Sequence, residues 1–194
     1  MKVHIFGEYG YEAAARGLSY SYKREAANMP PVMERLAPVD GGHNLFLETC
    51  FLWIDITAPL YWWKQIDRYR APADGDEGFL PCATTQQSES TMHTLMARPL
   101  TQDDFERPIW PSTLARLNES IAARDFESAN NELPGGFLQA RMKVTNYKSL
   151  RNIIAQRRTH RLGAWRIFCR EIYAQCQHPE FLRDLAADVK LKAT

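Results

Sequence analysis

The chain has 194 residues, a formal net charge of +1 and 45% hydrophobic residues. This length is enough for one domain with a hydrophobic core, and the hydrophobic fraction is ordinary for a globular protein. The net charge does not by itself indicate a partner. The longest apolar run, Cys50–Ile54, is too short to span a bilayer, and the N-terminal residues lack the apolar region of a signal peptide. We therefore expect a cytoplasmic protein without a membrane partner.

The cysteines are spaced too irregularly to form a disulfide framework or a zinc site. They lie at Cys50, Cys82, Cys169 and Cys176, and no two of them form a CxxC pair. This usage is typical of reduced thiols. We expect no metal.

The first part of the chain alternates strand and helix signals. Lys2–Phe6 is predicted to be a short strand, and Tyr11–Lys23 a helix rich in alanine. Val32–Leu36 lies between prolines and is predicted to be a short helix. Phe46–Ile56 is dense in β-branched and aromatic residues, which favours a buried strand. A proline suited to a first helical turn then precedes the predicted helix Leu60–Arg70.

The second part of the chain is mostly helical in pattern. Ala71–Cys82 is rich in Pro, Gly and acidic residues and is predicted to be a mobile loop. Thr113–Asn130 is predicted to be one helix, and Phe137–Val144 either a helix or an extended link. Further helices are predicted at Tyr147–Arg158, Gly163–Gln175 and Pro179–Lys190. The pattern indicates a single α+β domain over residues 1–194, mostly helical.

One arginine lies where a globular helix would place an apolar residue. Leu150, Ile153 and Ile154 form the apolar stripe of the predicted helix Tyr147–Arg158, and Arg157 occupies the next position of that stripe. A guanidinium on a buried face needs an anionic or strongly polar partner. This helix contains no Asp or Glu, so the partner comes either from elsewhere in the chain or from a ligand.

The residues around Arg157 follow a recognisable spacing. Leu133-Pro134 precedes Asn-x-Lys-Ser-Leu-x-Asn (residues 146–152), and Arg157 follows five residues later. This run resembles the C-terminal signature of the flavin-dependent thymidylate synthases, with Lys148 in place of an Arg. Upstream, two further segments resemble the family's GHxxFEH and APxxxxRQxxRHR motifs: Gly42–Thr49 and Ala58–Arg70. The matches occur in the family's order and cover most of the chain.

The resemblance implies a fold, an assembly and a reaction. The fold is a central sheet with flanking helices, and the assembly is a homotetramer with active sites at subunit interfaces. The reaction is reductive transfer of a one-carbon unit to C5 of a pyrimidine deoxynucleotide. FAD is the implied cofactor, and NADPH and methylenetetrahydrofolate are the implied co-substrates. The departures from the motifs suggest a divergent, phage-type member.

The resemblance also implies roles for individual residues. Arg157 is expected to contact the pyrimidine ring and polarise it, which makes it the first catalytic candidate. The flavin-binding candidates are Arg68, Tyr69, Arg70, Asn146, Lys148 and Asn152, with Tyr69 in place of the family's His. Simpler alternatives stay open. Arg157 could form a buried salt bridge, Asn146 could be a helix N-cap, and the arginines near Tyr69 could be ordinary surface residues.

The substrate side departs further from the family pattern. The family's S-x-N-E-x-S-x-R-Y loop is replaced by Gln86–His93, in which we expect Ser88, Ser90 and His93 to face the substrate, with Ser90 also catalytic. The alternative for this segment is a solvated loop. Glu127 keeps a family position, whereas Asn130 replaces a substrate-binding Arg and Thr49 replaces a His. The expected substrate is therefore dUMP-like or a cytosine analogue.

Two other functions remain possible on this sequence. The chain could be a non-catalytic nucleotide-binding protein of the same fold. Alternatively, the basic stretch Arg141–Arg170 could bind nucleic acid. No helix-turn-helix, RNP or OB signature accompanies that stretch, so we expect no nucleic-acid partner.

Overall fold

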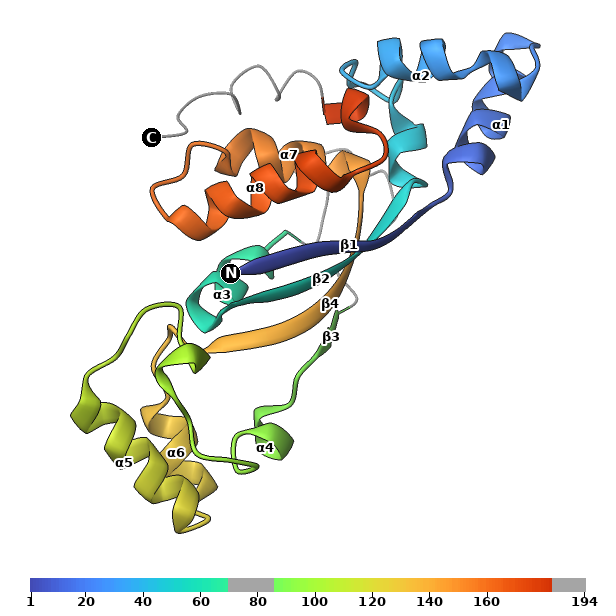
Figure 1. Ribbon diagram of the computed structural model, residues 1–194. Helices are drawn as coiled ribbons and strands as arrows, with labels where there is room; N and C mark the ends of the chain where they lie inside the picture. The colour runs from blue at the N-terminus through green and yellow to red at the C-terminus, as the bar shows by residue number, and fades with distance from the viewer. Residues whose placement is uncertain (70–85, 183–194) are drawn as a thin grey trace. The chain divides into compact units, whose positions relative to one another are not determined.

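A computed structural model describes residues 1–69 and 86–182 of the chain (Figure 1). The strands are β1 (Lys2–Tyr9), β2 (Phe51–Pro59), β3 (Gln86–Ser88) and β4 (Leu138–Asn146). They form one sheet in the order β1-β2-β4-β3. The helices are α1 (Tyr11–Tyr22), α2 (Pro30–Leu36), α3 (Leu60–Ile66), α4 (Thr91–Thr94), α5 (Pro111–Ala122), α6 (Phe126–Glu132), α7 (Tyr147–Arg157) and α8 (Gly163–Gln175). The predicted α+β class is confirmed.

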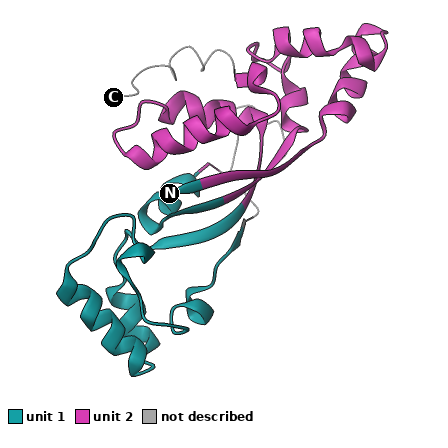
Figure 2. Cartoon of the chain, in the orientation of Figure 1, with its two compact units in different colours: residues 1–2, 56–68, 87–142 teal, residues 3–55, 69–86, 143–194 magenta. Residues whose placement is uncertain are grey.

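The chain forms two compact units, which Figure 2 shows in different colours. Unit 1 comprises residues 1–2, 56–68 and 87–142, and unit 2 comprises residues 3–55, 69–86 and 143–194. Strands β2 and β4 are each divided between the two units. The single domain over residues 1–194 stays a prediction.

In unit 2, α7 and α8 lie side by side (Figure 1). The predicted apolar stripe of α7 is confirmed, because Leu150, Ile153 and Ile154 are all buried. Helix α8 has the predicted bounds and buries Trp165 and Phe168 completely. Burial of whole aromatic side chains supplies a large part of the hydrophobic stabilisation of such a helix pair.

In unit 1, the prediction of a single helix over Thr113–Asn130 is wrong, because the segment forms two helices, α5 and α6. The chain turns between α5 and α6 because Arg124 adopts a left-handed conformation, with φ of 59°. The Asp125 side chain then accepts a hydrogen bond from Ser128 N at 3.1 Å and begins α6 as its N-cap. The two helices pack over the core of this unit, formed by Leu95, Leu100, Phe105, Leu117, Ile121, Ala129 and Phe137.

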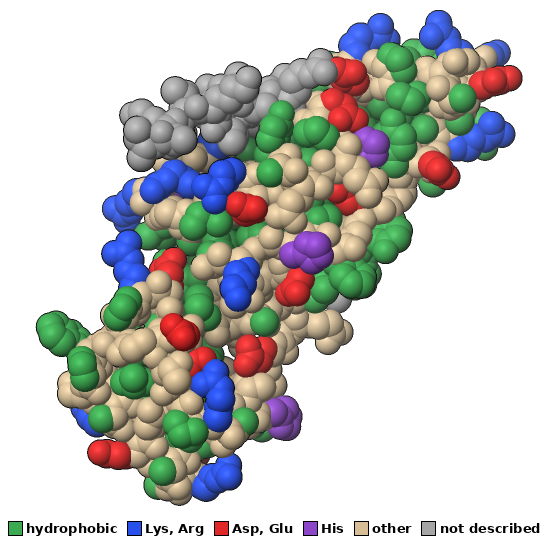
Figure 3. All heavy atoms as spheres, viewed as in Figure 1, with side chains coloured by type: hydrophobic (Ala, Val, Ile, Leu, Met, Phe, Trp, Pro, Cys, Tyr) green, Lys and Arg blue, Asp and Glu red, His purple; other side chains and the backbone are tan. Residues whose placement is uncertain are grey.

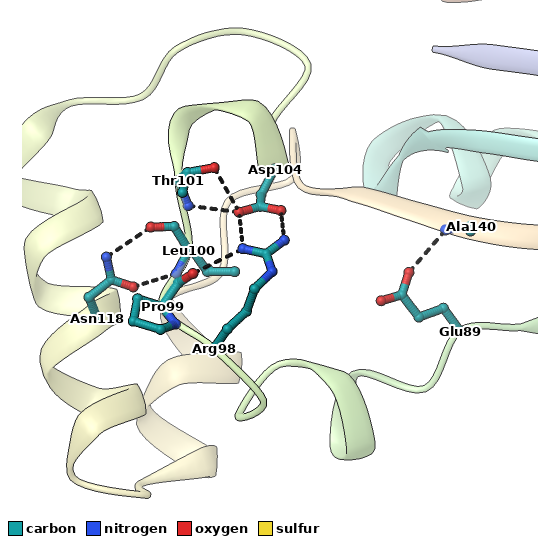
Figure 4. A network of polar contacts seen from close by, with 8 residues as sticks. All are labelled: Glu89, Arg98, Pro99, Leu100, Thr101, Asp104, Asn118 and Ala140. Carbon is teal, nitrogen blue, oxygen red and sulfur yellow. Dashed lines mark hydrogen bonds and ion pairs between the residues drawn. The ribbon is translucent and has the colours of Figure 1, made fainter.

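A polar network holds the segment before α5 against that helix (Figure 4). Arg98 donates to both carboxylate oxygens of Asp104, which holds the pKa of Asp104 below its ordinary value. The Asn118 side chain on α5 accepts from Leu100 N at 2.7 Å and donates to Leu100 O at 3.0 Å. This pairing satisfies both backbone groups of a residue that is nearly excluded from solvent.

Other predicted boundaries shift. The strand predicted over Phe46–Ile56 begins only at Phe51, because Leu45–Glu48 forms a 3₁₀ turn. The ambiguous segment Phe137–Val144 lies almost entirely in β4. The solvated-loop alternative is wrong for Gln86–Ser88, which forms β3 beside β4.

Several predictions concern residues outside the described part. The loop Ala71–Cys82 is one of them, and only Pro179–Leu182 of the predicted last helix is described, as a 3₁₀ turn.

Cys50, Cys169 and Cys176 are free and buried. Among the described residues, no helix has the length and apolar character needed to cross a membrane.

The start of α1 depends on a glycine. Gly10 has φ of +96°, and a Cβ placed there would lie 2.1 Å from the carbonyl oxygen of Thr49. We expect Gly10→Ala to lower the free energy of unfolding by at least about 1–3 kcal/mol, through backbone strain and this clash.

The matched control is Gly17→Ala within α1, where a Cβ meets no atom within 4 Å. This change should raise the free energy of unfolding by about 0.5–1 kcal/mol, because alanine favours helix. Chemical denaturation measures both variants, and equal stabilities for the two would contradict the role assigned to Gly10.

Candidate functional site

The junction from β4 into α7 is built around Asn146. Its side-chain oxygen accepts a hydrogen bond from Ser149 N at 2.8 Å, which makes it the N-cap of α7. Its Nδ2 donates to the carbonyl oxygen of Glu48 at 3.1 Å, and the residue is 2% exposed. The capping alternative is therefore confirmed. A flavin contact from Asn146 stays a prediction.

Lys148, in the first turn of α7, is held by an ion pair. Its Nζ lies 2.7 Å from Glu48 Oε1, and both side chains are largely shielded from solvent. The Asn146 and Lys148 contacts together fasten the start of α7 to the 3₁₀ turn that contains Glu48. Because its charge is already compensated, Lys148 can hold a ligand phosphate only by sharing or leaving this pair.

Arg157, at the last position of α7, lies against two aromatic rings. Its guanidinium carbon lies 4.9 Å from the ring centre of Trp165 and 5.4 Å from that of Tyr69. Its Nε donates to the Tyr69 hydroxyl at 2.6 Å. No carboxylate pairs with it among the described residues, so the salt-bridge alternative is not realised there. The partners are aromatic rings and one neutral hydroxyl, so no described residue compensates the positive charge.

A chain of hydrogen bonds extends from Arg157 along α7. The Tyr69 hydroxyl donates to Gln156 Oε1 at 2.9 Å, and Gln156 Nε2 donates to Asn152 Oδ1 at 3.0 Å. The structure thus brings together three predicted residues, namely Tyr69, Asn152 and Arg157. Gln156 was not among the residues predicted from the sequence. Its spacing of four residues from Asn152 on one helix face was the available signal.

The remaining flavin candidates lie elsewhere. Arg68 follows α3 in unit 1 and is exposed, whereas Arg70 falls outside the described residues. Arg141, the first residue of the predicted basic stretch, lies in unit 1. Its guanidinium carbon is 4.5 Å from the Trp63 ring centre, and it pairs with Asp67 at 3.3 Å. Burial lowers the pKa of Arg141. This arginine is a structural element, since its partners come from within unit 1.

The substrate candidates around α4 are exposed residues of unit 1. Ser88 ends β3, Ser90 precedes α4, and His93 lies within α4. The Ser90 side chain makes no capping bond, so its hydroxyl is available to a ligand. Glu89 lies between Ser88 and Ser90 and holds them near β4, because its Oε2 accepts a hydrogen bond from Ala140 N at 3.2 Å (Figure 4).

The other substrate candidates lie on α6. Glu127 is in its first turn, where a carboxylate suits the helix dipole, and Asn130 lies three residues further on. Both side chains are exposed. Neither supplies the positive charge that a nucleotide phosphate needs. Thr49, the third departure, is in unit 2 and donates its hydroxyl to Phe46 O at 2.9 Å.

The basic stretch Arg141–Arg170 does not form one open surface. Arg141 and Lys148 are each held in an ion pair and largely shielded from solvent. Arg170 pairs with Glu171, and Arg166 donates to two backbone carbonyls. On the face drawn in Figure 3, basic side chains gather over α8 with acidic ones beside them. This mixture is unlike the continuous positive patch of a nucleic-acid interface.

A cavity of about 430 Å³ lies beside the start of α1 in unit 2. Its walls include Glu8 and Glu12, and Tyr11 stacks on His178 with ring centres 3.9 Å apart. None of the predicted site residues lines it, and its carboxylates would repel a phosphate. The described residues contain no group of three or more His, Cys, Asp or Glu side chains that could hold a metal ion.

Comparison of the whole fold with solved structures identifies similar proteins, although no family model and no curated protein sequence matches the chain. One is the flavin-dependent thymidylate synthase ThyX from Helicobacter pylori complexed with FAD and dUMP. The TM-score is 0.73 at 12% identity, over 95% of this chain and 99% of that one. A second structure of the same enzyme, also with FAD and dUMP, has a TM-score of 0.72 at 12% identity. It covers 98% of this chain and 99% of that one. The predicted resemblance is thus confirmed at the level of the fold.

The cap at Asn146 can be tested directly. We expect Asn146→Ala to lower the free energy of unfolding by about 0.5–2 kcal/mol, because the Ser149 amide and the Glu48 carbonyl each lose a partner. Asn146→Ser keeps a capping oxygen and should lose less. The measurement is urea denaturation followed by circular dichroism. An alanine variant as stable as the parent protein would show that the cap contributes nothing.

Proposed function

We propose that this chain is a flavin-dependent enzyme that transfers a one-carbon unit reductively to C5 of a pyrimidine deoxynucleotide. The substrate is dUMP-like or a cytosine analogue, and NADPH and methylenetetrahydrofolate are the co-substrates. The proposal includes a cytoplasmic homotetramer, which light scattering would test. Its main support is a fold match over nearly the whole length of an enzyme that carries both FAD and dUMP.

The donor chemistry of unit 2 fits a flavin ring. Arg157 has an uncompensated positive charge, and Asn152 has an amide with one side unpaired among the described residues. The carbonyl-rich edge of a flavin or pyrimidine accepts such donors, and the part-exposed ring of Tyr69 offers flat apolar surface. Tyr69, Asn152 and the exposed Arg68 would hold FAD. When bound in reduced form, FAD supplies hydride chemistry.

The proposed role of Arg157 is to stabilise negative charge on the nucleotide. Attack at the ring carbons of a pyrimidine pushes electron density onto its carbonyl oxygens. A guanidinium that is fixed before the reaction stabilises this charge without reorganising. The Tyr69 and Trp165 rings shield part of the Arg157 guanidinium from solvent, which strengthens its interaction with a bound anion. Ser88, Ser90 and His93 are the further proposed substrate contacts, with Ser90 as the second catalytic candidate.

A non-catalytic nucleotide-binding protein of this fold is the competing proposal. The colour of the purified protein separates the two first, because bound flavin is yellow. A colourless protein that still binds a pyrimidine deoxynucleotide would favour the non-catalytic alternative.

Arg157 should be required for binding. We expect Arg157→Ala to weaken deoxynucleotide binding by about 30-fold or more, because a partly buried charged contact is lost. Isothermal titration with dUMP measures this loss. Arg161→Ala, which removes an exposed arginine of the same unit, is the control and should bind normally. A folded Arg157→Ala protein with unchanged affinity would remove Arg157 from the site.

Turnover of dUMP should be weak even if it binds. Asn130 replaces a positively charged substrate contact, and the Thr49 hydroxyl is engaged by Phe46 O. A lost substrate contact of about 1.4 kcal/mol lowers the rate about tenfold. For two such contacts, we expect dUMP methylation to be about a hundredfold slower than in an ordinary family enzyme. The assay is tritium release from C5-labelled dUMP with FAD, NADPH and methylenetetrahydrofolate. Comparable turnover would show that other residues, such as those of Ser88–His93, replace the missing contacts.

A further inference from the structure

The hydrogen bonds around Arg157 have a fixed direction. A guanidinium has only donors, so the Tyr69 hydroxyl must accept from Arg157 Nε and direct its own proton elsewhere. That proton goes to Gln156 Oε1, which turns the Gln156 amide so that Nε2 donates to Asn152 Oδ1. The donor and acceptor of each hydrogen bond are therefore determined by the bond before it in the chain.

This direction determines what the ends of the chain offer to a ligand. At one end, Nη1 and Nη2 of Arg157 have no hydrogen-bond partner among the described residues. At the other end, Asn152 uses its oxygen on Gln156 and keeps its Nδ2 donors unpaired within the described part of the chain. Both ends therefore present donors, and an acceptor-bearing ligand such as a carbonyl-rich ring or an anion matches them.

We propose that Tyr69 and Gln156 are positioning residues that orient Arg157 and Asn152 as paired donors toward the carbonyl-bearing edge of the ligand. This inference rests on the proposed function for the identity of the ligand. Tyr69 is the decisive residue, because its ring also packs against Trp165, with centres 6.0 Å apart at 74°. A phenylalanine would keep this packing and lose both the acceptor for Arg157 and the donor to Gln156.

The test is a double-mutant cycle on the full-length protein. The dissociation constant of dUMP is measured by isothermal titration for the parent protein, Tyr69→Phe, Arg157→Ala and the double variant. We expect Tyr69→Phe to weaken binding by about tenfold in the parent protein, because a hydrogen bond to a charged group is lost. In the Arg157→Ala background the same change should cost less than about twofold. Gln156→Leu should weaken binding in the same direction and by less.

Tyr20→Phe is the matched control. Arg16 lies over the Tyr20 ring at 5.1 Å, but the Tyr20 hydroxyl makes no hydrogen bond to it, so dUMP affinity should not change. Equal losses from Tyr69→Phe in both backgrounds, or no loss in either, would overturn the proposal. Thermal unfolding of each variant checks that the fold is kept.

A second measurement separates this inference from the proposed function. The Nε–H proton of Arg157, assigned through the Arg157→Ala spectrum, should exchange slowly with solvent in the ligand-free protein and rapidly in Tyr69→Phe. If the parent protein binds no dUMP but this difference appears, the proposed function fails and the positioning contact stands. If the exchange rate is the same in both proteins, the positioning role is refuted whatever the ligand.

Discussion

The junction at Asn146 determines where the candidate site lies within unit 2. The side chain of Asn146 caps α7 and at the same time binds the Glu48 carbonyl, while Tyr147 N donates to Cys50 O at 3.1 Å. The Lys148–Glu48 pair adds a charged contact to the same turn. A helix is stiff and rises about 1.5 Å per residue, so an orientation fixed at its start carries along its length. The direction of α7 at Arg157 is thereby set about 16 Å from the cap.

The position of Arg157 shows how a charge can lie on an apolar stripe without a carboxylate partner. Two aromatic faces and a hydroxyl replace part of the lost hydration, and the charge itself is not cancelled. An ion pair at this position would have compensated the charge and reduced its attraction for a ligand. The observed arrangement keeps the guanidinium fixed and its attraction for an acceptor intact. That combination is the physical basis for assigning a ligand-binding role to this residue.

The candidate residues divide between the units according to their chemistry. Those of unit 2 are donors held by internal contacts, as Tyr69 and Asn152 show. Those of unit 1 are exposed and mostly neutral, with Glu127 negative. In unit 1 the exposed Arg68 is the candidate able to attract a phosphate. Asn130, where the resemblance would place an arginine, adds no positive charge to unit 1.

The sequence alone predicted the α+β class, the bounds of α8 and the apolar stripe of α7, because these follow from local periodicity and capping. The resemblance to the flavin-dependent thymidylate synthases could also be found there, since it depends on motif spacing. Only the tertiary structure showed that Glu48 pairs with Lys148 and that Tyr69 and Trp165 pack against Arg157. These partners are separated by many residues, and no local pattern encodes which distant side chains meet. The break at Arg124 was missed for a related reason, because a left-handed residue other than glycine leaves little trace in the sequence.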